Sequence, residues 1–215
     1  MNEIIQTLAI YAIPVIFAIT LHEAAHGYVA RLFGDPTAQQ AGRVTLNPIK
    51  HIDPVGTILV PVVILLTSKL LGGGGLLFGW AKPVPVDFGR LRHPKRDMLW
   101  VALAGPASNL VMAILWALAL RLSLEAGVQE AFWFEVGRAG VMVNLVLMAL
   151  NLLPILPLDG GRVLFSLLPH RLAWQYSRIE PYGLMIVLLL LVTDVLWVLM
   201  EPIFGLGAII VNWFL

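Results

Sequence analysis

Long stretches without a charged side chain constrain this chain more than any other feature of its sequence. The clearest runs from Met98 to Leu120, and two others cover Ile4–Thr20 and Ala139–Leu158. A helix of about 20 apolar residues spans the hydrocarbon core of a bilayer. Apolar residues make up 59% of the 215-residue chain and charged residues only 13%, which is more apolar surface than a soluble fold of this length can bury. The sequence therefore predicts an all-α polytopic membrane protein.

Three further apolar segments add to this prediction. Val55–Leu71 precedes a run of glycines, Pro181–Met200 contains a single charged residue, and Pro202–Leu215 is short. We interpret the first as a re-entrant segment, the second as a span and the third as a terminal or re-entrant helix. The chain is thus expected to form a bundle of about five to six transmembrane or re-entrant helices.

Two more polar segments predict short membrane-associated β segments. Arg43–Leu46 precedes an Asn-Pro turn and is typical of a short strand. Lys82–Asp87 contains two prolines, which permit only an edge strand or an extended segment. An unwound substrate could pair with such an edge as an added strand.

The remaining composition narrows the class of function. The formal net charge of +1 gives no indication of nucleic-acid binding, and the absence of cysteine excludes disulfides and thiolate zinc sites. No basic residue occurs in Met1–Gln6, so the first helix is expected to be retained rather than cleaved as a signal peptide. We expect one domain covering residues 1–215.

The segment His22-Glu23-Ala24-Ala25-His26 carries the chemistry that the sequence predicts most clearly. It continues the first apolar helix and fits the H-E-x-x-H pattern. Residues four apart share one helix face, so both imidazoles can reach one Zn²⁺. Glu23 lies beside them, where its carboxylate can take a proton from zinc-activated water. The alternative, two histidines that are merely buried, fits poorly with the cost of polar groups in a membrane.

A catalytic zinc needs a third protein ligand and keeps one position open for water. Asp159 is the candidate, and the site would then hold one zinc per chain. It follows the uncharged stretch that ends at Leu158 and precedes Gly160-Gly161, whose glycines let the backbone leave helical geometry. The alternative for Asp159 is a helix-terminating turn at the membrane surface.

Together these motifs resemble the site-2 protease family of intramembrane zinc metalloproteases. The resemblance rests on His22–His26, on the segment Asn151–Gly161, and on Ala104–Asn109, which is similar to an Ala-Gly-Pro-x-x-Asn helix of that family. It covers nearly the whole chain and is closest to the compact members without PDZ or nucleotide-sensing domains. It implies His22, His26 and Asp159 as zinc ligands, Glu23 as the catalytic base, and Asn151 near the substrate backbone.

The family likeness also implies a function and a location. The protein would hydrolyse peptide bonds in or near transmembrane segments of single-pass membrane proteins, such as anti-sigma factors or signal-peptide remnants. It would lie in the plasma membrane of a bacterium or archaeon, and its oligomeric state is left open.

Three asparagines in apolar segments have a physical rationale of their own. A substrate helix must unwind before its peptide bond can be attacked, and amide side chains could then bind the freed backbone groups. The alternative is hydrogen bonding between helices of the bundle. For Asn109 and Asn144 both interpretations stay open, whereas the substrate role is favoured for Asn151.

The distribution of basic residues predicts the topology. Arg31, Arg43 and Lys50 follow the first helix, so this loop and the adjacent zinc site are expected on the cytoplasmic side. If the apolar segment after Val55 crossed completely, Asp159 would emerge on the opposite side from His26. We therefore expect residues 55–78 to enter the bilayer and return.

Two other functions are consistent with some of these features. A zinc protease of the prenyl-protein-processing kind would use a glutamate as third ligand, and no later acidic residue is better placed than Asp159. A metal transporter or an inactive binding protein would need no base at Glu23, and a transporter would have polar residues along a path across the membrane.

Overall fold

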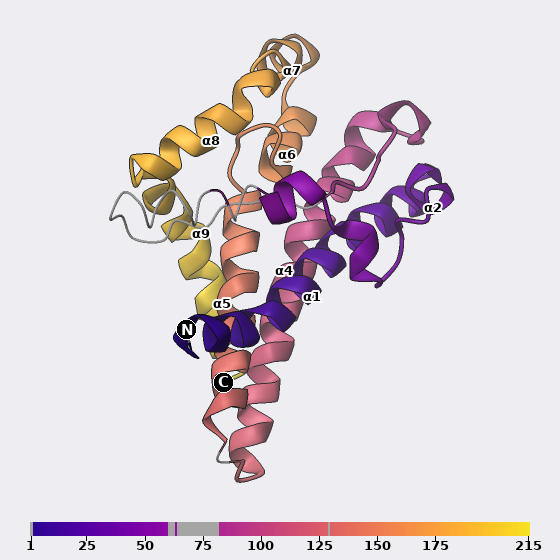
Figure 1. Cartoon of the computed structure of the whole chain (residues 1–215). Helices are drawn as coiled ribbons and strands as arrows, with labels where there is room; N and C mark the ends of the chain where they lie inside the picture. The colour runs from indigo at the N-terminus through magenta and orange to yellow at the C-terminus, as the bar shows by residue number, and fades with distance from the viewer. Residues whose placement is uncertain (1, 60–62, 64–81, 129) are drawn as a thin grey trace.

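The computed structural model describes residues 2–59, 63, 82–128 and 130–215. Most of these residues are helical, and four helices are long and apolar enough to cross a membrane (Figure 1). They are α1 (Asn2–Leu32), α4 (Pro94–Glu125), α5 (Ala131–Asn151) and α9 (Val195–Asn212). The described part of the chain is therefore a helical, multi-pass membrane fold, as the sequence predicts.

Shorter elements gather mainly at one end of this bundle. Figure 1 shows α6, α7 and α2 at the end opposite the loop that joins α4 to α5. The short elements are α2 (Thr37–Gln40), η1 (Pro48–His51), η2 (Pro54–Leu59), η3 (Phe88–Arg90), α6 (Asp159–Leu167), α7 (His170–Ser177), η4 (Glu180–Tyr182) and α8 (Gly183–Val192).

Small residues hold the antiparallel helices α4 and α5 together. Ala113 and Ala117 of α4 are fully buried against Leu145 and Met148 of α5. A side chain at Gly140 would overlap the indole ring of Trp116. Close backbone approach through small residues is the usual way in which membrane helices associate, because lipid supplies no hydrophobic driving force between them.

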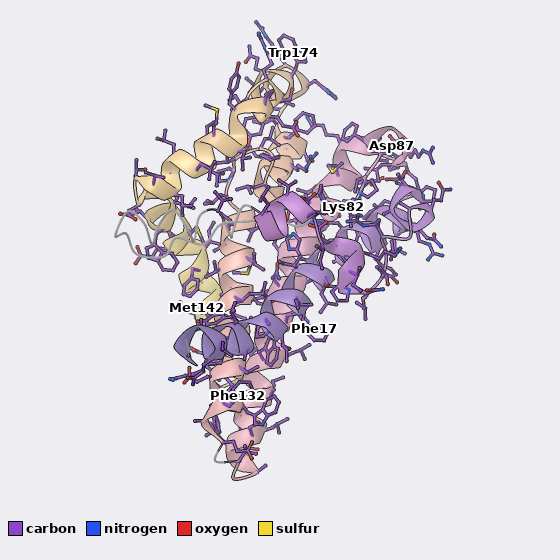
Figure 2. All side chains as sticks on the ribbon, in the orientation of Figure 1. Phe17, Lys82, Asp87, Phe132, Met142 and Trp174 are labelled. Atoms are coloured by element: carbon purple, nitrogen blue, oxygen red, sulfur yellow. The ribbon has the colours of Figure 1, made fainter. Side chains whose placement is uncertain are left out.

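Large apolar side chains cover the outside of the bundle instead. Figure 2 labels three of them, Phe17, Phe132 and Met142, whose exposed fractions are 50%, 40% and 48%. An apolar exterior over small buried residues is the arrangement expected of a protein whose solvent is the bilayer.

The two expected β segments are not found, and no described residue lies in a strand. Residues 44–46 form bends, and Arg43 and residues 82–87 are irregular. The reason is that side chains occupy their hydrogen-bonding groups. Arg43 donates to the carbonyl oxygen of Lys82 over 2.5 Å, while the N–H groups of Val84 and Asp87 donate to the carboxylates of Glu23 and Asp35.

Two helix boundaries also differ from expectation. Helix α5 ends at Asn151 rather than Leu158, because Pro154 and Pro157 lie three residues apart and together remove two N–H groups that a continued helix would donate. The expected span 181–200 is broken at Asp194, which has φ 59° and separates α8 from α9. Aspartate tolerates this left-handed conformation better than most residues. Pro202, where a break was expected, lies inside α9.

Two residues that flank the expected re-entrant segment 55–78 are in contact. The N–H of Lys82 donates to the carbonyl oxygen of His51 over 3.0 Å. A single crossing between these residues would separate them by about 30 Å, the thickness of the hydrocarbon core. The contact is what a returning segment requires. Most of residues 55–78 lie outside the described residues, so the path itself stays a prediction.

This contact makes a prediction about sidedness in a chain that contains no cysteine. Single cysteines that replace the exposed Lys50 and Arg92 should both react with an impermeant thiol reagent from the same side of the membrane. A cysteine that replaces Glu125, at the far end of α4, should react from the opposite side. Labelling of intact cells and inverted vesicles measures this, and labelling of Lys50→Cys and Arg92→Cys from opposite sides would contradict the returning path.

Candidate metal centre

Two imidazoles from one face of α1 meet in the interior of the bundle. His22 and His26 are 7% and 9% exposed, and their Nε2 atoms lie 3.1 Å apart. The four-residue spacing on a continuous helix brings both rings to the same side. The sequence prediction that these two side chains can reach a common ion is therefore geometrically satisfied.

The carboxylate of Asp159 completes the group from the first residue of α6. Its Oδ2 lies 3.1 Å from Nε2 of His22, and its Oδ1 lies 3.3 Å from Nε2 of His26. A side chain at Gly160 would overlap the carbonyl groups of Leu152 and Leu153. Glycine at this position thus lets the loop after α5 fold tightly against α6 and carry Asp159 inward.

A buried hydrogen-bond network fixes which ring nitrogen of His22 carries the proton. Nδ2 of Asn109 donates to the carbonyl oxygen of Ala18 over 3.3 Å and to Oδ1 of Asn144 over 3.0 Å. Nδ2 of Asn144 in turn donates to the carbonyl oxygen of Gly140 over 2.8 Å. The Oδ1 of Asn109 must therefore face His22, where it accepts from Nδ1 over 2.6 Å.

The same tautomer is fixed in His26 by the backbone. Its Nδ1 lies 2.7 Å from the carbonyl oxygen of Val101 on α4, an atom that can only accept. Both Nε2 atoms are then left as lone-pair donors that point toward Asp159. Metal-ligating histidines are commonly oriented in this way by a partner on the other ring nitrogen.

The result is a buried cluster of electron-pair donors without a proton between them. One ligand atom from each of His22, His26 and Asp159 can be chosen so that all three lie within 4.8 Å of one another. Oδ2 of Asp159 is buried and accepts no hydrogen bond from the described residues, although Nε2 of His22 is only 3.1 Å away. Such a cluster is unfavourable unless a cation occupies it, so the residues present fit a divalent metal ion.

A metal ion between the three groups would favour the ionised form of Asp159, because an opposite charge at short range stabilises a carboxylate.

Helix α4 approaches the two imidazoles through a glycine. A Cβ atom built at Gly105 would lie 2.6 Å from Cε1 and Nε2 of His22 and would overlap Nε2 of His26. Sequence reasoning noticed the Ala-Gly-Pro-x-x-Asn pattern but did not assign Gly105 or Val101 a place at the centre. The glycine in that pattern was the available signal for a close approach, whereas no side-chain type marks the carbonyl group of Val101.

Glu23 lies beside the centre and is half-buried. Its Oε2 accepts a hydrogen bond of 2.7 Å from the backbone N–H of Val84. Its other oxygen, Oε1, accepts none from the residues that the structure describes. The carboxylate is therefore held at one oxygen and open at the other, which suits a group that exchanges a proton with water.

The three asparagines lie in different environments. Asn109 and Asn144 are both 0% exposed and connect α1, α4 and α5, which is the interhelical alternative considered for them. Asn151 is half-buried at the end of α5 and donates from Nδ2 to the carbonyl oxygen of Leu147 over 3.0 Å. Its Oδ1 has no partner among the described residues, so the substrate role stays a prediction for Asn151.

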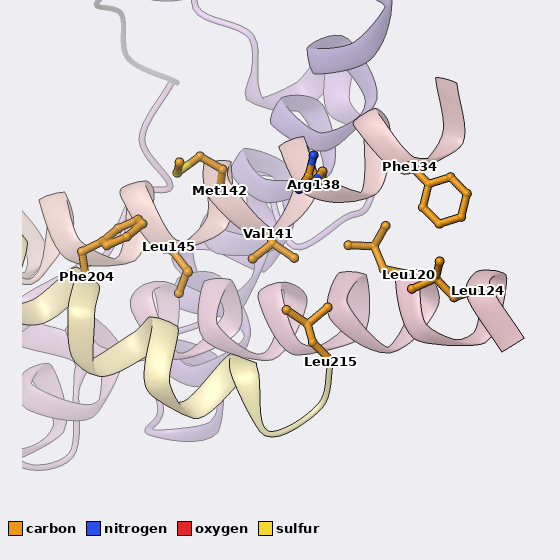
Figure 3. A pocket seen from close by; sticks show the side chains of 9 residues that line it. All are labelled: Leu120, Leu124, Phe134, Arg138, Val141, Met142, Leu145, Phe204 and Leu215. Carbon is orange, nitrogen blue, oxygen red and sulfur yellow. The ribbon is translucent and has the colours of Figure 1, made fainter. Parts of the chain in front are cut away.

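A separate pocket of about 550 Å³ lies toward the other end of α4 and α5 (Figure 3). It is about 22 Å along α4 from Gly105, at 1.5 Å per residue to Leu120. Apolar side chains of α4, α5 and α9 line it together with Arg138. Arg138 is the single ionisable side chain among the lining residues, so this pocket lacks the groups for metal binding or acid–base chemistry.

Membrane-crossing helices around a buried His-His-Asp cluster define a polytopic membrane protein with a candidate metal centre of the H-E-x-x-H type. The chain belongs to peptidase family M50, the site-2 protease family. The model of the family described as "Peptidase family M50" matches residues 124–193. The chain is 40% identical over 194 residues to "Putative zinc metalloprotease YwhC" of Bacillus subtilis, which covers 86% of this chain and 83% of that protein.

Two mycobacterial relatives carry the name "Putative zinc metalloprotease Rip2". The protein of Mycolicibacterium smegmatis is 30% identical over 181 residues, which cover 84% of this chain and 66% of that protein. The protein of Mycobacterium tuberculosis is 32% identical over 165 residues, which cover 74% and 60%. The chain thus matches less than two thirds of the length of either relative. No solved structure matches the chain significantly.

The close approach at Gly105 predicts that Gly105→Ala abolishes or strongly weakens metal binding, because the added methyl group occupies the space in front of both imidazoles. Metal content of the purified protein and competition with a chelator measure the effect. Gly205→Ala is the matched control, since a Cβ atom at Gly205 in α9 meets nothing within 4 Å. Unchanged metal affinity in Gly105→Ala would show that the metal does not lie between the two histidines and α4.

The hydrogen bond from His22 predicts a smaller effect at Asn109. Asn109→Ala removes the acceptor that orients the ring and should weaken metal affinity about 10- to 100-fold, the range for partners of metal ligands. Asn144→Ala leaves that acceptor in place and should cost less. Titration with zinc in a competing chelator compares the two variants, and a larger loss for Asn144→Ala would contradict the direction of the network.

Proposed function

We propose that this protein is an intramembrane zinc endopeptidase that hydrolyses peptide bonds in or near transmembrane segments of other membrane proteins. One observation carries the proposal. Two tautomer-fixed imidazoles and one carboxylate meet inside a membrane bundle, and an acidic side chain stands beside them. The names of the relatives, which are zinc metalloproteases, support zinc as the ion.

The ligand set suits zinc in a catalytic role. Two histidine nitrogens and a carboxylate oxygen are three protein ligands, and a fourth position stays open in catalytic zinc sites. We expect one zinc per chain. When bound, zinc would lower the pKa of water toward about 7 and polarise a peptide carbonyl group.

Glu23 supplies the proton transfers that hydrolysis needs. Its free oxygen accepts a proton from the attacking water, whose oxygen forms a bond to the carbonyl carbon of the substrate. The C–N bond then breaks, and the same carboxyl group can return the proton to the leaving amine, so that one water is consumed for each bond cut. His22, His26 and Asp159 hold the centre in position, and Asn109 and Val101 hold the two rings.

The burial of the centre favours a single-pass membrane protein as substrate. A transmembrane helix hides its peptide groups, so it must unwind locally before it reaches the site, and each unpaired backbone group is then costly in lipid. We propose that Oδ1 of Asn151 accepts a freed backbone N–H at this stage. Its position at the end of α5, just before the loop that carries Asp159, supports this role.

The charge distribution supports a cytoplasmic position for the metal end. Arg31, Arg43, Lys50, Arg92 and Lys95 all belong to segments at or beside this end. Basic residues near membrane-crossing helices are enriched on the cytoplasmic side. We propose a multi-pass protein of the plasma membrane with its active site nearer the cytoplasm.

Glu23→Gln tests the mechanism. The variant keeps the side-chain shape but cannot take a proton, so zinc and fold should persist while cleavage falls by at least about 100-fold. Comparison of membrane proteomes from cells that express wild type or Glu23→Gln identifies substrates as proteins that accumulate in the variant. Cleavage of such a substrate is then measured in liposomes, with zinc determined on the same sample.

Asp159→Ala is the companion variant and should lose zinc and activity together. Full activity of Glu23→Gln with zinc retained would contradict the assignment of the base. Absence of any accumulating membrane protein would contradict the proposed substrate class, and tight zinc binding by an active Asp159→Ala would remove Asp159 from the ligand set.

A further inference from the structure

We propose that the backbone N–H of Val84 is the positioning group of Glu23, delivered by the rigid segment Pro83-Val84-Pro85 through a gap that Gly27 leaves open on α1. This inference rests on the proposed function, since it assigns a partner to the proposed base. The sequence predicts an edge strand for residues 82–87, but the segment is irregular. Its Val84 N–H donates to a side chain of α1 instead of to a neighbouring strand.

The contact itself is short and charge-assisted. The N–H of Val84 donates to Oε2 of Glu23 over 2.7 Å, across 61 residues of sequence. Val84 is 9% exposed, so water has little access to the bond. Hydrogen bonds to carboxylates are stronger than neutral ones, more so in a buried setting. The bond restrains one oxygen of the carboxylate and leaves Oε1 for water.

Proline on both sides makes Val84 the sole donor of this short stretch. Pro83 and Pro85 have no N–H, and Pro85 biases Val84 toward an extended conformation. The segment therefore presents a single N–H on a stiff backbone. Little conformational freedom remains to be lost when that N–H meets Glu23, which is the advantage of a preorganised partner.

The segment is anchored on each side of Val84. Lys82, labelled in Figure 2, donates its N–H to the carbonyl oxygen of His51, and its own carbonyl oxygen accepts from Arg43. At the other end, the N–H of Asp87 donates to Oδ2 of Asp35 over 2.7 Å. Burial alone raises the pKa of Asp35, but the hydrogen bonds from Thr37 and Asp87 outweigh it and keep the pKa below its ordinary value, so this anchor is charged.

Gly27 permits the segment to come this close to α1. A Cβ atom at Gly27 would lie 3.0 Å from Cβ of Ala38 and from Cγ2 of Val44, and 3.2 Å from Cγ1 of Val84. These distances are tighter than ordinary contacts between carbon atoms. A methyl group at this position, one residue after His26, would require Ala38, Val44 and Val84 to shift by a few tenths of an ångström, and a shift of Val84 lengthens its bond to Glu23. Gly27, the glycine after the H-E-x-x-H pattern, thus leaves room for Val84 to contact Glu23.

Val84→Pro removes the N–H and keeps an apolar side chain, so it tests the contact directly. We expect kcat to fall about 10-fold or more, the range for loss of one hydrogen bond to a charged group, with KM and zinc content unchanged. Val84→Ala keeps the donor and should lose far less. Val86→Pro is the matched proline control, because the N–H of Val86 donates no hydrogen bond to the described residues. The substrate is the membrane protein found to accumulate with Glu23→Gln.

A second measurement follows the bond without activity. Hydrogen exchange of the Val84 amide, resolved by NMR in protein labelled with ¹⁵N at valine, reports this one N–H. Its exchange should accelerate at least about 10-fold in Glu23→Ala relative to wild type. If Val84→Pro fails to bind zinc, Gly27→Ala replaces it and should lower kcat and accelerate the exchange of Val84, both in the same direction.

The outcomes separate this inference from the proposed function. Wild-type kcat in Val84→Pro with an inactive Glu23→Gln overturns the positioning role alone, as does an equal loss in Val84→Ala and Val84→Pro. Unchanged exchange in Glu23→Ala also overturns it. Full activity of Glu23→Gln overturns the proposed base instead, whatever the exchange experiment shows.

Discussion

The rest of this structure depends on the orientation of two imidazole rings inside a membrane bundle. Nδ1 of His22 donates to Asn109 and Nδ1 of His26 donates to the carbonyl oxygen of Val101, so both Nε2 lone pairs face Asp159. The cluster cannot satisfy itself by internal hydrogen bonds, since all three groups accept. A bound cation would compensate the three electron-pair donors, and the packing of the surrounding helices keeps these donors close together.

Close approaches between backbone segments allow the three candidate ligands to come together. Glycines stand where α4 passes the histidines, where α6 folds under its preceding loop, and where α1 meets the segment that carries Val84. Each one removes a side chain that would otherwise separate two elements. In a membrane bundle such close approaches also supply much of the packing attraction, because the lipid offers no hydrophobic gain for helix association. Stability and site geometry therefore draw on the same small residues.

Among the described residues, the polar groups that orient the metal ligands are fully buried, whereas those proposed to contact water or substrate are half-buried. The buried amides Asn144 and Asn109 form a hydrogen-bonded chain from the carbonyl group of Gly140 to His22, and this chain fixes the proton on Nδ1 of His22. The half-buried Glu23 and Asn151 each keep one oxygen that has no partner among the described residues. Groups that orient the ligands are thus fully satisfied, and groups proposed to meet water or substrate are not. The apolar pocket at the far end of α4 and α5 shares none of this polarity.

The sequence by itself determined the helical membrane class, the family likeness and the candidate ligands, because hydrophobic length and the H-E-x-x-H spacing are local properties of the chain. Asp159 could be named from its glycines but not placed, since its distance from His22 depends on how the helices between them in the sequence pack. Only the tertiary structure decided that Asn109 and Asn144 pair helices, that α8 and α9 separate at Asp194, and that residues 82–87 form no strand. These outcomes depend on which acceptor, distant in the sequence, lies within hydrogen-bonding distance of a given donor in the folded chain. A local sequence pattern contains no information on that distance.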